Sequence, residues 1–418
     1  MRKLLKTLVV ISFAIVALVI VIWLGFRAKE YVVGNDYVDY LEANMESVPL
    51  GETPDFALMA EDLAAYPLIL VGEIHGFEAP LHFDVDLFSH LLTEYDVRDY
   101  LVELDPSQAY FLNRYNETGD DSLLTRALEN WVVRSGRNNR DYRDKWVALR
   151  EAYRSERSFR YLGANNLSDV PLLFDHLNML GDGGRIQYDA AQVDSLNLAA
   201  ARLEVARRLD TLPAADSVRR ADYTYLLENI DAALDDRYRE EVLTDNVRAL
   251  YERFDLKDEK VYGFFGLGHT LLAPLEDGYT AMAARLSESD PWFEGRILSA
   301  NFLFVDSYMT LWSRNLPSIL RDDGPYTRVP TSYDDLLLSY IYGIEDLKRV
   351  TEPRTTTIFK LDGTDSPYRT SNRLFRTTKL LPMGQLMNAR EDLAAADYGQ
   401  YVVFARNSDW AEPISVVQ

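Results

Sequence analysis

Residues 68–80 read LILVGEIHGFEAP, and this stretch decides the fold class. An apolar run, Leu68 to Val71, ends at a glycine, and a glutamate and a histidine follow within three residues. A short continuous apolar run that ends at a glycine is typical of a strand buried on both faces of a parallel sheet. Glu73 and His75 therefore lie at the end of a predicted strand. The glycines there let the backbone turn sharply and leave room for a ligand.

Similar apolar runs recur along the chain, and helical patterns separate the first of them. This alternation predicts an α/β fold with a mostly parallel or mixed central sheet flanked by helices. The expected strands cover residues 67–71, 100–104, 160–163, 261–265, 296–305 and 400–405. The expected helices between the first strands cover residues 81–95, 106–115, 122–133 and 142–156.

A long, charged stretch at residues 188–254 differs from the rest because its apolar residues recur with a helical period. It predicts an insertion of two to three helices at about residues 186–257, hinged by the glycine cluster GDGGR at 181–185. The expected organisation is a membrane anchor at residues 1–30, a linker at 31–55 and one α/β domain at 56–418 that carries this insertion.

The N-terminus contains an uncharged run of residues 7–26, preceded by Arg2, Lys3 and Lys6. Twenty helical residues rise about 30 Å, enough to cross the hydrocarbon core of a bilayer. No small-x-small cleavage site follows, so the pattern favours an uncleaved signal anchor, that is, one N-terminal transmembrane helix. The positive-inside rule then predicts a single-pass membrane protein with a cytoplasmic N-terminus and a periplasmic or extracellular main domain.

Composition excludes several classes of function. The chain has 66 acidic against 44 basic residues, a net charge of −22, which repels nucleic acid. It contains no cysteine, so disulfides, a thiol nucleophile and thiolate metal sites are excluded. The expected partners are a small-molecule or peptide substrate and, through the N-terminal helix, a membrane.

Polar side chains follow three of the predicted strands. Glu73 and His75 follow the first, Glu103 lies near the end of the second with Asp105 just beyond it, and His269 follows the run GFFGLG. The carboxyl ends of parallel strands meet at one edge of a sheet, so we expect His75, Glu103 and His269 to share a pocket bordered by Glu73. A single histidine after a strand is more often structural, but two of them with an intervening glutamate favour a joint site.

Other histidines give weaker signals. His82, Asp86 and His90 recur every four residues on one predicted helix, a spacing that can hold a metal, but their face borders solvent. His176 is expected to be a helix-surface residue or a half-buried one with its polar atoms satisfied. The chain has no G-x-S-x-G elbow and no P-loop, which excludes a serine triad hydrolase of that type and a P-loop NTPase.

The segments VGEIHG, LVELDP with NRY downstream, RYREEVLTDNV and GLGH occur in this order. Together they resemble the erythromycin esterase-like family over about residues 67–286. That family belongs to a wider group with ChaN-type haem-binding lipoproteins and Tiki/TraB-type proteins, which share paired G-x-x-H motifs and an intervening glutamate. The resemblance implies a hydrolase of an ester or amide bond.

By this resemblance, His75 is the general base with Glu73 beside it, and Glu103 and His269 complete the catalytic site. Arg239 and Asn246 are expected to bind substrate from the helix that precedes the GLGH strand.

Two hydrolytic mechanisms fit these residues, and two non-enzymatic functions remain open. In the first mechanism, neutral His75 takes a proton from water while a glutamate fixes its tautomer, and His269 polarises the scissile carbonyl. In the second, His75, Glu103 and His269 bind one divalent metal, Zn, Mn or Co, whose water attacks. The sequence slightly favours the metal-free mechanism. One non-enzymatic alternative is haem or iron binding with a histidine as axial ligand, and another is a wholly structural, partner-binding role at the membrane.

Overall fold

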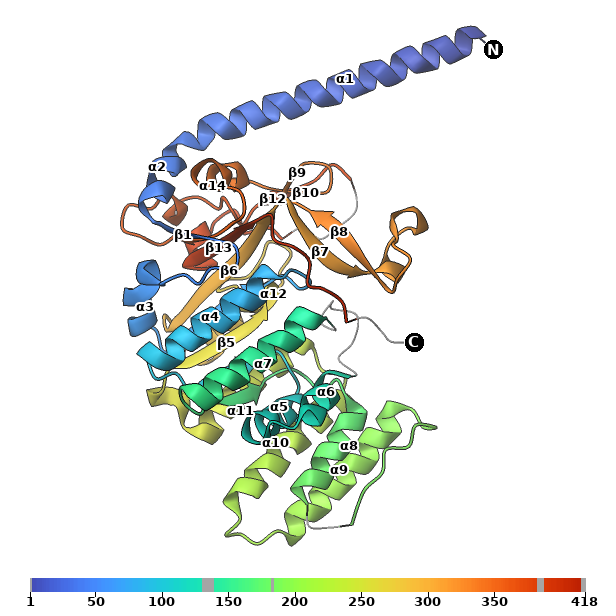
Figure 1. The fold of residues 1–418 in the computed structure, drawn as a ribbon, viewed down its shortest axis with the longest axis vertical. Helices are drawn as coiled ribbons and strands as arrows, with labels where there is room; N and C mark the ends of the chain where they lie inside the picture. Colours follow the sequence, from blue (N-terminus) through green and yellow to red (C-terminus); the bar gives the residue numbers. More distant parts are fainter. Residues whose placement is uncertain (1, 130–138, 182–183, 382–386, 415–418) are drawn as a thin grey trace.

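The computed structural model describes residues 2–129, 139–181, 184–381 and 387–414. Within them, an eight-stranded mixed sheet in the order β1-β11-β13-β6-β2-β5-β3-β4 lies between helices (Figure 1). The strands from β13 to β4 are parallel, whereas β11 pairs antiparallel with both β13 and β1. The strands are β1 (Met45–Pro49), β2 (Leu68–Glu73), β3 (Asp99–Val102), β4 (Arg160–Gly163), β5 (Val261–Gly266), β6 (Ile297–Val305), β11 (Thr355–Lys360) and β13 (Tyr401–Arg406). The prediction of an α/β fold with a mixed sheet flanked by helices is confirmed.

The six strands expected from apolar runs all lie in the parallel part of this sheet. Strand β2 is central: Gly72 pairs with Phe265 of β5 on one side and with Asn301 of β6 on the other. All six residues of β2 are buried, because helices cover both faces of the sheet. Burial on both faces explains why this strand reads as an uninterrupted apolar run.

The strands that the sequence did not predict lie outside that parallel part. Residues 31–55, expected to be a linker, contain helix α2 and strand β1, which pairs with β11 at the edge of the sheet. Edge strands and small sheets bury only part of their side chains, so their sequences alternate weakly or carry polar residues. The remaining strands are β7 (Ser307–Trp312) with β8 (Tyr326–Thr331), and β9 (Asp334–Asp335), β10 (Ser339–Ile341) and β12 (Thr377–Thr378).

Helices cover both faces of the sheet, and some of them form a separate cluster. Helices α4 and α7 pack on one face, α11 and α13 on the other, and α8, α9 and α10 share an apolar cluster of their own. Helices α9 to α11 occupy the expected insertion, and the expected helix at 122–133 begins as α6, although its residues 130–133 lie outside the described residues. The helices are α1 (Arg2–Val33), α2 (Asn35–Ala43), α3 (Ala60–Ala65), α4 (Ala79–Glu94), α5 (Pro106–Thr118), α6 (Asp121–Glu129), α7 (Arg140–Ser155), α8 (Val170–Leu180), α9 (Asp194–Thr211), α10 (Ser217–Leu234), α11 (Arg239–Phe254), α12 (Leu267–Thr270), α13 (Met282–Ser289) and α14 (Ile344–Val350).

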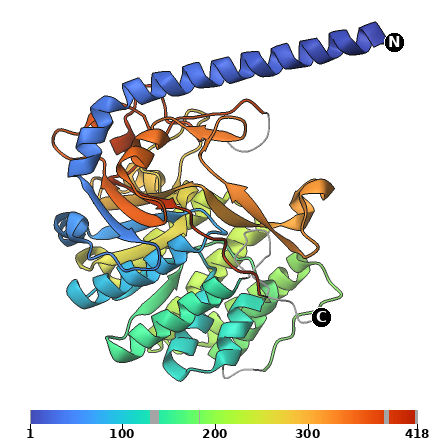
Figure 2. The same cartoon turned by 45° about the horizontal axis from the view of Figure 1, so that its top comes forward.

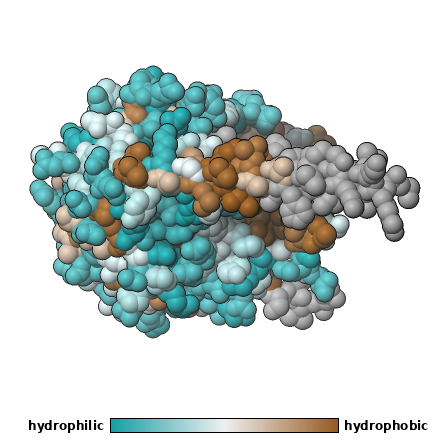
Figure 3. Space-filling view, turned by 90° about the horizontal axis from the view of Figure 1, so that it is seen from above, coloured by the Kyte–Doolittle hydropathy of each residue, from teal (hydrophilic) through white to brown (hydrophobic). Residues whose placement is uncertain are grey.

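The N-terminal helix α1 projects from the rest of the chain (Figures 1 and 2). Among the residues that the structure describes, no helix combines the length and the apolar character that a membrane span requires. The expected transmembrane helix at residues 7–26 is therefore wrong, and the single-pass topology and location derived from it are withdrawn. The last turns of α1 instead carry charges that contact the domain: Arg27 pairs with Glu345, and Glu30 lies 3.0 Å from Arg373. Figure 3 shows apolar side chains gathered on one face of the molecule, and the exposed apolar residues of α1 include Leu18, Ile20, Val21, Ile22, Trp23 and Leu24.

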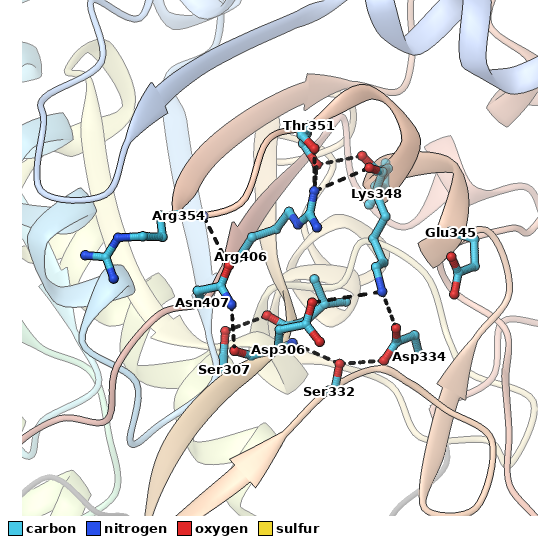
Figure 4. A network of polar contacts seen from close by, with 12 residues as sticks. Asp306, Ser307, Ser332, Asp334, Glu345, Lys348, Thr351, Arg354, Arg406 and Asn407 are labelled. Atoms are coloured by element: carbon cyan, nitrogen blue, oxygen red, sulfur yellow. Dashed lines mark hydrogen bonds and ion pairs between the residues drawn. The ribbon is translucent and has the colours of Figure 1, made fainter.

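Residues just beyond β6 and β13 form a polar network with α14, which we call the Lys348–Arg406 network (Figure 4). Lys348 Nζ contacts Asp334 and lies 4.0 Å from an Asp306 carboxylate oxygen. Arg406 donates hydrogen bonds to the backbone carbonyls of Thr351 and, at 3.4 Å, of Lys348. This part of the sheet edge is thus closed by cations that already contact carbonyl and carboxylate oxygens.

Candidate functional site

Two glycines position the loop that follows β2. A Cβ atom at Gly72 would come within 2.3 Å of Thr270 Oγ1, so only glycine fits there. Gly76 has a φ of +96°, and a Cβ atom there would lie 2.7 Å from the Thr310 carbonyl oxygen. The Gly76 carbonyl accepts 2.9 Å hydrogen bonds from the backbone N–H groups of Thr310 and Ala411. The loop that carries His75 is therefore held on both sides.

Glu73 and His75 form a pair at the end of β2. The Nδ1 atom of His75 lies 2.9 Å from Oε1 of Glu73, whose side chain is only 2% exposed. This contact favours the tautomer with the proton on Nδ1, assigned from its partner, so that Nε2 points the other way. The His75 side chain is 27% exposed, and its Nε2 lies 4.0 Å from Oε2 of Glu103. Solvent can therefore reach this imidazole.

Glu103 follows β3 directly and lies between the two imidazoles of the site. Its side chain is 4% exposed, and both of its oxygens accept hydrogen bonds. Oε1 accepts from Arg239 Nη2 at 2.5 Å, and Oε2 accepts from the backbone N–H of Gly266 at 2.6 Å. Arg239 also donates to Asn165 Oδ1 at 3.1 Å. These donors compensate the buried charge of Glu103 and fix its orientation.

His269 lies on α12, the single short turn that follows β5. Its Nδ1 is 2.7 Å from Oε1 of Glu240, and its Nε2 is 3.6 Å from Oε1 of Glu103. Burial alone would lower the pKa of His269, but the charges of Glu103 and Glu240 and their hydrogen bonds outweigh it and raise the pKa to about 9. His269 is therefore an imidazolium at neutral pH.

Glu240 and Tyr279 belong to the same cluster, and the sequence interpretation missed both. Glu240 is 3% exposed and accepts a 3.0 Å hydrogen bond from the Met282 backbone. A signal for it exists, because Glu240 shares a three- and seven-residue spacing with Leu243 and Val247, which places a carboxylate on the buried stripe of α11. Burial and then the Glu240 charge raise the pKa of Tyr279, whose hydroxyl donates to Gly268 O at 3.1 Å.

Two residues that the sequence singled out have structural contacts. The Asn246 amide donates to the Ala164 carbonyl at 2.9 Å and exchanges hydrogen bonds with Asn229, so the structure does not bring it to the two histidines. Its expected part in substrate binding stays a prediction. Asp105 caps α5 by accepting from the backbone N–H groups of Ser107 and Gln108, both at 2.9 Å.

The other histidines are dispersed. His90 packs against the rings of Phe56 and Tyr95, and His82 lies near Glu78. His176 is buried and stacks on Tyr110, with 4.0 Å between ring centroids, and burial lowers its pKa to about 3. His176 is thus satisfied by a 3.1 Å contact between its Nδ1 and Ser107 Oγ, but it is buried, whereas the sequence predicted a helix-surface or half-buried position.

The three expected metal ligands are engaged with one another: Nε2 of His75 and Nε2 of His269 face different oxygens of Glu103, at 4.0 Å and 3.6 Å. Both oxygens of Glu103 already accept hydrogen bonds from Arg239 and Gly266. Within the described ranges, the one group of three candidate ligands whose ligand atoms all lie within 4.8 Å of one another is Glu78, His82 and Asp141.

Comparisons with known proteins show the fold. No protein-family model matches the sequence, and no curated protein matches it either. A crystal structure of a Bacillus cereus protein is 12% identical, with a TM-score of 0.61, and covers 91% of this chain and 99% of that one. A succinoglycan biosynthesis protein is 14% identical, with a TM-score of 0.58, and covers 92% and 99%.

Erythromycin esterase EreC in its open conformation is 14% identical, with a TM-score of 0.55, and covers 90% of this chain and 99% of that one. These likenesses show a shared fold. The fold of erythromycin esterase EreC is the one that the motif resemblance implied. A haem complex of ChaN from Campylobacter jejuni is matched with a TM-score of 0.30, which is too low to support an argument about haem.

Proposed function

We propose that this protein is a metal-free hydrolase of carboxylic esters or amides, with His75 as general base. One observation carries the proposal: the Nε2 atoms of His75 and His269 lie 4.0 Å and 3.6 Å from the two oxygens of one glutamate, Glu103. One of these nitrogens is set to accept a proton and the other to donate one. The erythromycin esterase fold supports the same class of reaction.

The base is His75. Glu73 holds the proton on Nδ1, so Nε2 accepts a proton from the attacking water, and the Glu73 charge stabilises the imidazolium that forms. The 4.0 Å between Nε2 and Glu103 exceeds a direct hydrogen bond and is a distance that a bridging water spans. The imidazolium then returns the proton to the leaving alcohol or amine, and the acyl group leaves as a carboxylate.

The electrophile is His269. Its pKa of about 9 keeps it positively charged at neutral pH, and Glu240 on Nδ1 directs Nε2–H toward the space beside Glu103. A cation there stabilises the negative charge that develops on the carbonyl oxygen in the transition state. Arg239, whose side chain is 42% exposed, binds Glu103 from the solvent side and is suited to orient the substrate. The net charge of −22 favours neutral or cationic substrates.

The test is hydrolysis of an activated ester, 4-nitrophenyl acetate, and of the matching anilide. His75→Ala is expected to lower kcat by about 10²–10⁴-fold with a melting temperature close to that of wild type, because a general base contributes that much and a partly exposed side chain adds little packing. His90→Ala is the matched control, since His90 lies away from the site and should keep full activity.

Two further readouts separate the alternatives. A chelator should leave the rate unchanged, whereas loss of activity that returns with Zn²⁺ or Mn²⁺ at this site would contradict the metal-free mechanism. A Soret band that disappears in His75→Ala or His269→Ala would favour haem binding. A His75→Ala variant with wild-type turnover and only a lower melting temperature would overturn the proposal.

A further inference from the structure

The first turns of α4 and α7 bring three potential metal ligands together outside the histidine site. Glu78, directly before α4, and His82 are four residues apart and therefore share a helix face, and Asp141 comes from α7. All three ligand atoms lie within 4.8 Å of one another, and His82 Nε2 is 3.8 Å from Glu78 Oε1. We propose that these side chains bind one divalent transition-metal ion.

The separations suit such an ion after a small side-chain movement. Zn–N and Zn–O bonds of about 2.0–2.2 Å in a tetrahedral site place neighbouring ligand atoms about 3.4 Å apart. The ligand atoms therefore need to approach by about 1.5 Å at most. The side chains of His82 and Glu78 are 51% and 37% exposed, so they can rotate without disturbing the core.

The surroundings favour a cation. Further carboxylates surround the ligands: Asp409 lies near Glu78, and Asp144 lies near Asp141. Several nearby basic side chains are engaged in other ion pairs, Lys145 with Asp84, Arg140 with Glu412 and Arg328 with Asp409, whereas Arg354 lines the cavity beside Glu78. A dication would relieve the repulsion between these carboxylates.

The three ligands leave coordination positions that open onto solvent-filled space. Glu78 and His82 line a cavity of about 230 Å³ together with Asp409, and His82 and Asp141 line a second cavity of about 270 Å³. Water or a small ligand can therefore complete the coordination from either side. One imidazole with two carboxylates suits Zn²⁺, Mn²⁺ or Co²⁺, whereas Ca²⁺ and Mg²⁺ prefer oxygen ligands alone.

The position of the site indicates what the ion would do. The Asp141 carboxylate accepts a 2.5 Å hydrogen bond from the Glu412 backbone, and the neighbouring Ala411 N–H binds the carbonyl of Gly76. An ion here would join α4, α7 and the C-terminal segment, and so fasten the loop that carries His75. This role is structural and does not depend on the proposed hydrolase activity.

The experiment measures the melting temperature and metal content of the full-length protein, stripped with a chelator and then supplied with Zn²⁺, Mn²⁺, Ca²⁺ or Mg²⁺. Zn²⁺ or Mn²⁺ at about 100 times its Kd should raise the melting temperature by about 4 °C for a chain of this size. Titration calorimetry should give one ion per chain. Ca²⁺ and Mg²⁺ should give much smaller shifts.

Variants assign the ligands. His82→Gln and Asp141→Asn should each lose the shift and the bound ion while keeping the wild-type circular dichroism spectrum. Asp86→Asn is the matched control, because Asp86 lines both cavities but is outside the ligand set, and it should keep both responses. If either variant does not fold, Glu78→Gln provides the same readout.

Two results would overturn the proposal. One is the absence of both a shift and stoichiometric binding in the stripped wild-type protein. The other is a bound ion and a melting shift that persist in His82→Gln or in Asp141→Asn. Because His75→Ala should still bind the ion, failure of this proposal and failure of the proposed hydrolase are distinguishable.

Discussion

The ends of β2, β3 and β5 and the ends of β6 and β13 lie along one edge of the same parallel sheet, yet they carry different side chains. In the first region, at the ends of β2, β3 and β5, two imidazoles flank the buried carboxylate of Glu103. One of them, that of His75, is 27% exposed. In the second region, at the ends of β6 and β13, Lys348 and Arg406 contact aspartate and backbone carbonyl oxygens. Lysine and arginine keep their charge at neutral pH, whereas the charge of an imidazole there depends on its partners.

This comparison shows that position at the carboxyl edge of a parallel sheet does not by itself make a reactive site. What distinguishes the first region is the pairing of each imidazole with its own carboxylate, Glu73 for His75 and Glu240 for His269. The pairing sets one ring as a base and the other as a permanent cation. The Lys348–Arg406 network has no such division and is expected to contribute only stability.

The largest effect is expected from Glu73→Gln. The glutamine amide can donate to Nδ1 of His75 and so favour the tautomer whose proton is on Nε2, which cannot accept one from water. We expect kcat for 4-nitrophenyl acetate to fall by about 10²–10⁴-fold. The melting temperature should change little, since the size of the side chain is kept. Unchanged kcat would show that Glu73 does not orient the base.

The pH dependence of stability comes next. His269 has a raised pKa, so its contribution to stability is complete below its unfolded pKa of about 6.5 and is lost as the pH rises through about 9. The free energy of unfolding should therefore fall over this window, by about 3 kcal/mol at most. His269→Asn should remove this slope, which denaturant unfolding at a series of pH values measures. The Lys348→Met variant should retain it.

Arg239→Gln should have an intermediate effect. It removes the guanidinium that donates to Glu103 Oε1 and leaves the hydrogen bond from the Gly266 N–H to Oε2 in place. We expect kcat/KM to fall by about 10–100-fold, in line with the loss of one charge-assisted hydrogen bond. If KM rises and kcat stays constant, Arg239 contacts the substrate and does not position Glu103.

Lys348→Met should have the smallest effect on the reaction and a modest one on stability. Removing the ammonium leaves Asp334, whose side chain is 14% exposed, without that ion pair. We expect a loss of about 1–2 kcal/mol in the free energy of unfolding and a kcat within about twofold of wild type. A large loss of activity in this variant would contradict the division between the two regions.

The sequence predicted the parallel part of the fold because those strands are buried on both faces. Runs such as residues 68–71 have no polar interruption, and the polar residues that end them mark the carboxyl edge of the sheet. The antiparallel strands β1 and β11 carry threonine, serine and glutamate and gave no such signal. The anchor expected at residues 7–26 followed from hydropathy alone, without the contacts of Arg27 and Glu30 with the domain.

The candidate site was predicted in part for a similar reason. His75, Glu103 and His269 follow strands, so topology places them together, and their order in the chain is visible in the sequence. Glu240 and Tyr279 come from a helix and a loop that approach only after folding. The distances that decide between a metal and a positively charged histidine are likewise set by tertiary packing.

Chemical rescue tests the central claim most directly. His75→Gly removes the imidazole and leaves a space beside Glu73 and Gly266, and added imidazole can then act as the base. The account predicts that this variant hydrolyses 4-nitrophenyl acetate at least about 100-fold more slowly than wild type. After subtraction of the rate in a His75→Gly, Glu73→Gln double variant, imidazole should restore turnover with saturation. Turnover by His75→Gly at the wild-type rate would contradict the assignment of His75 as the general base.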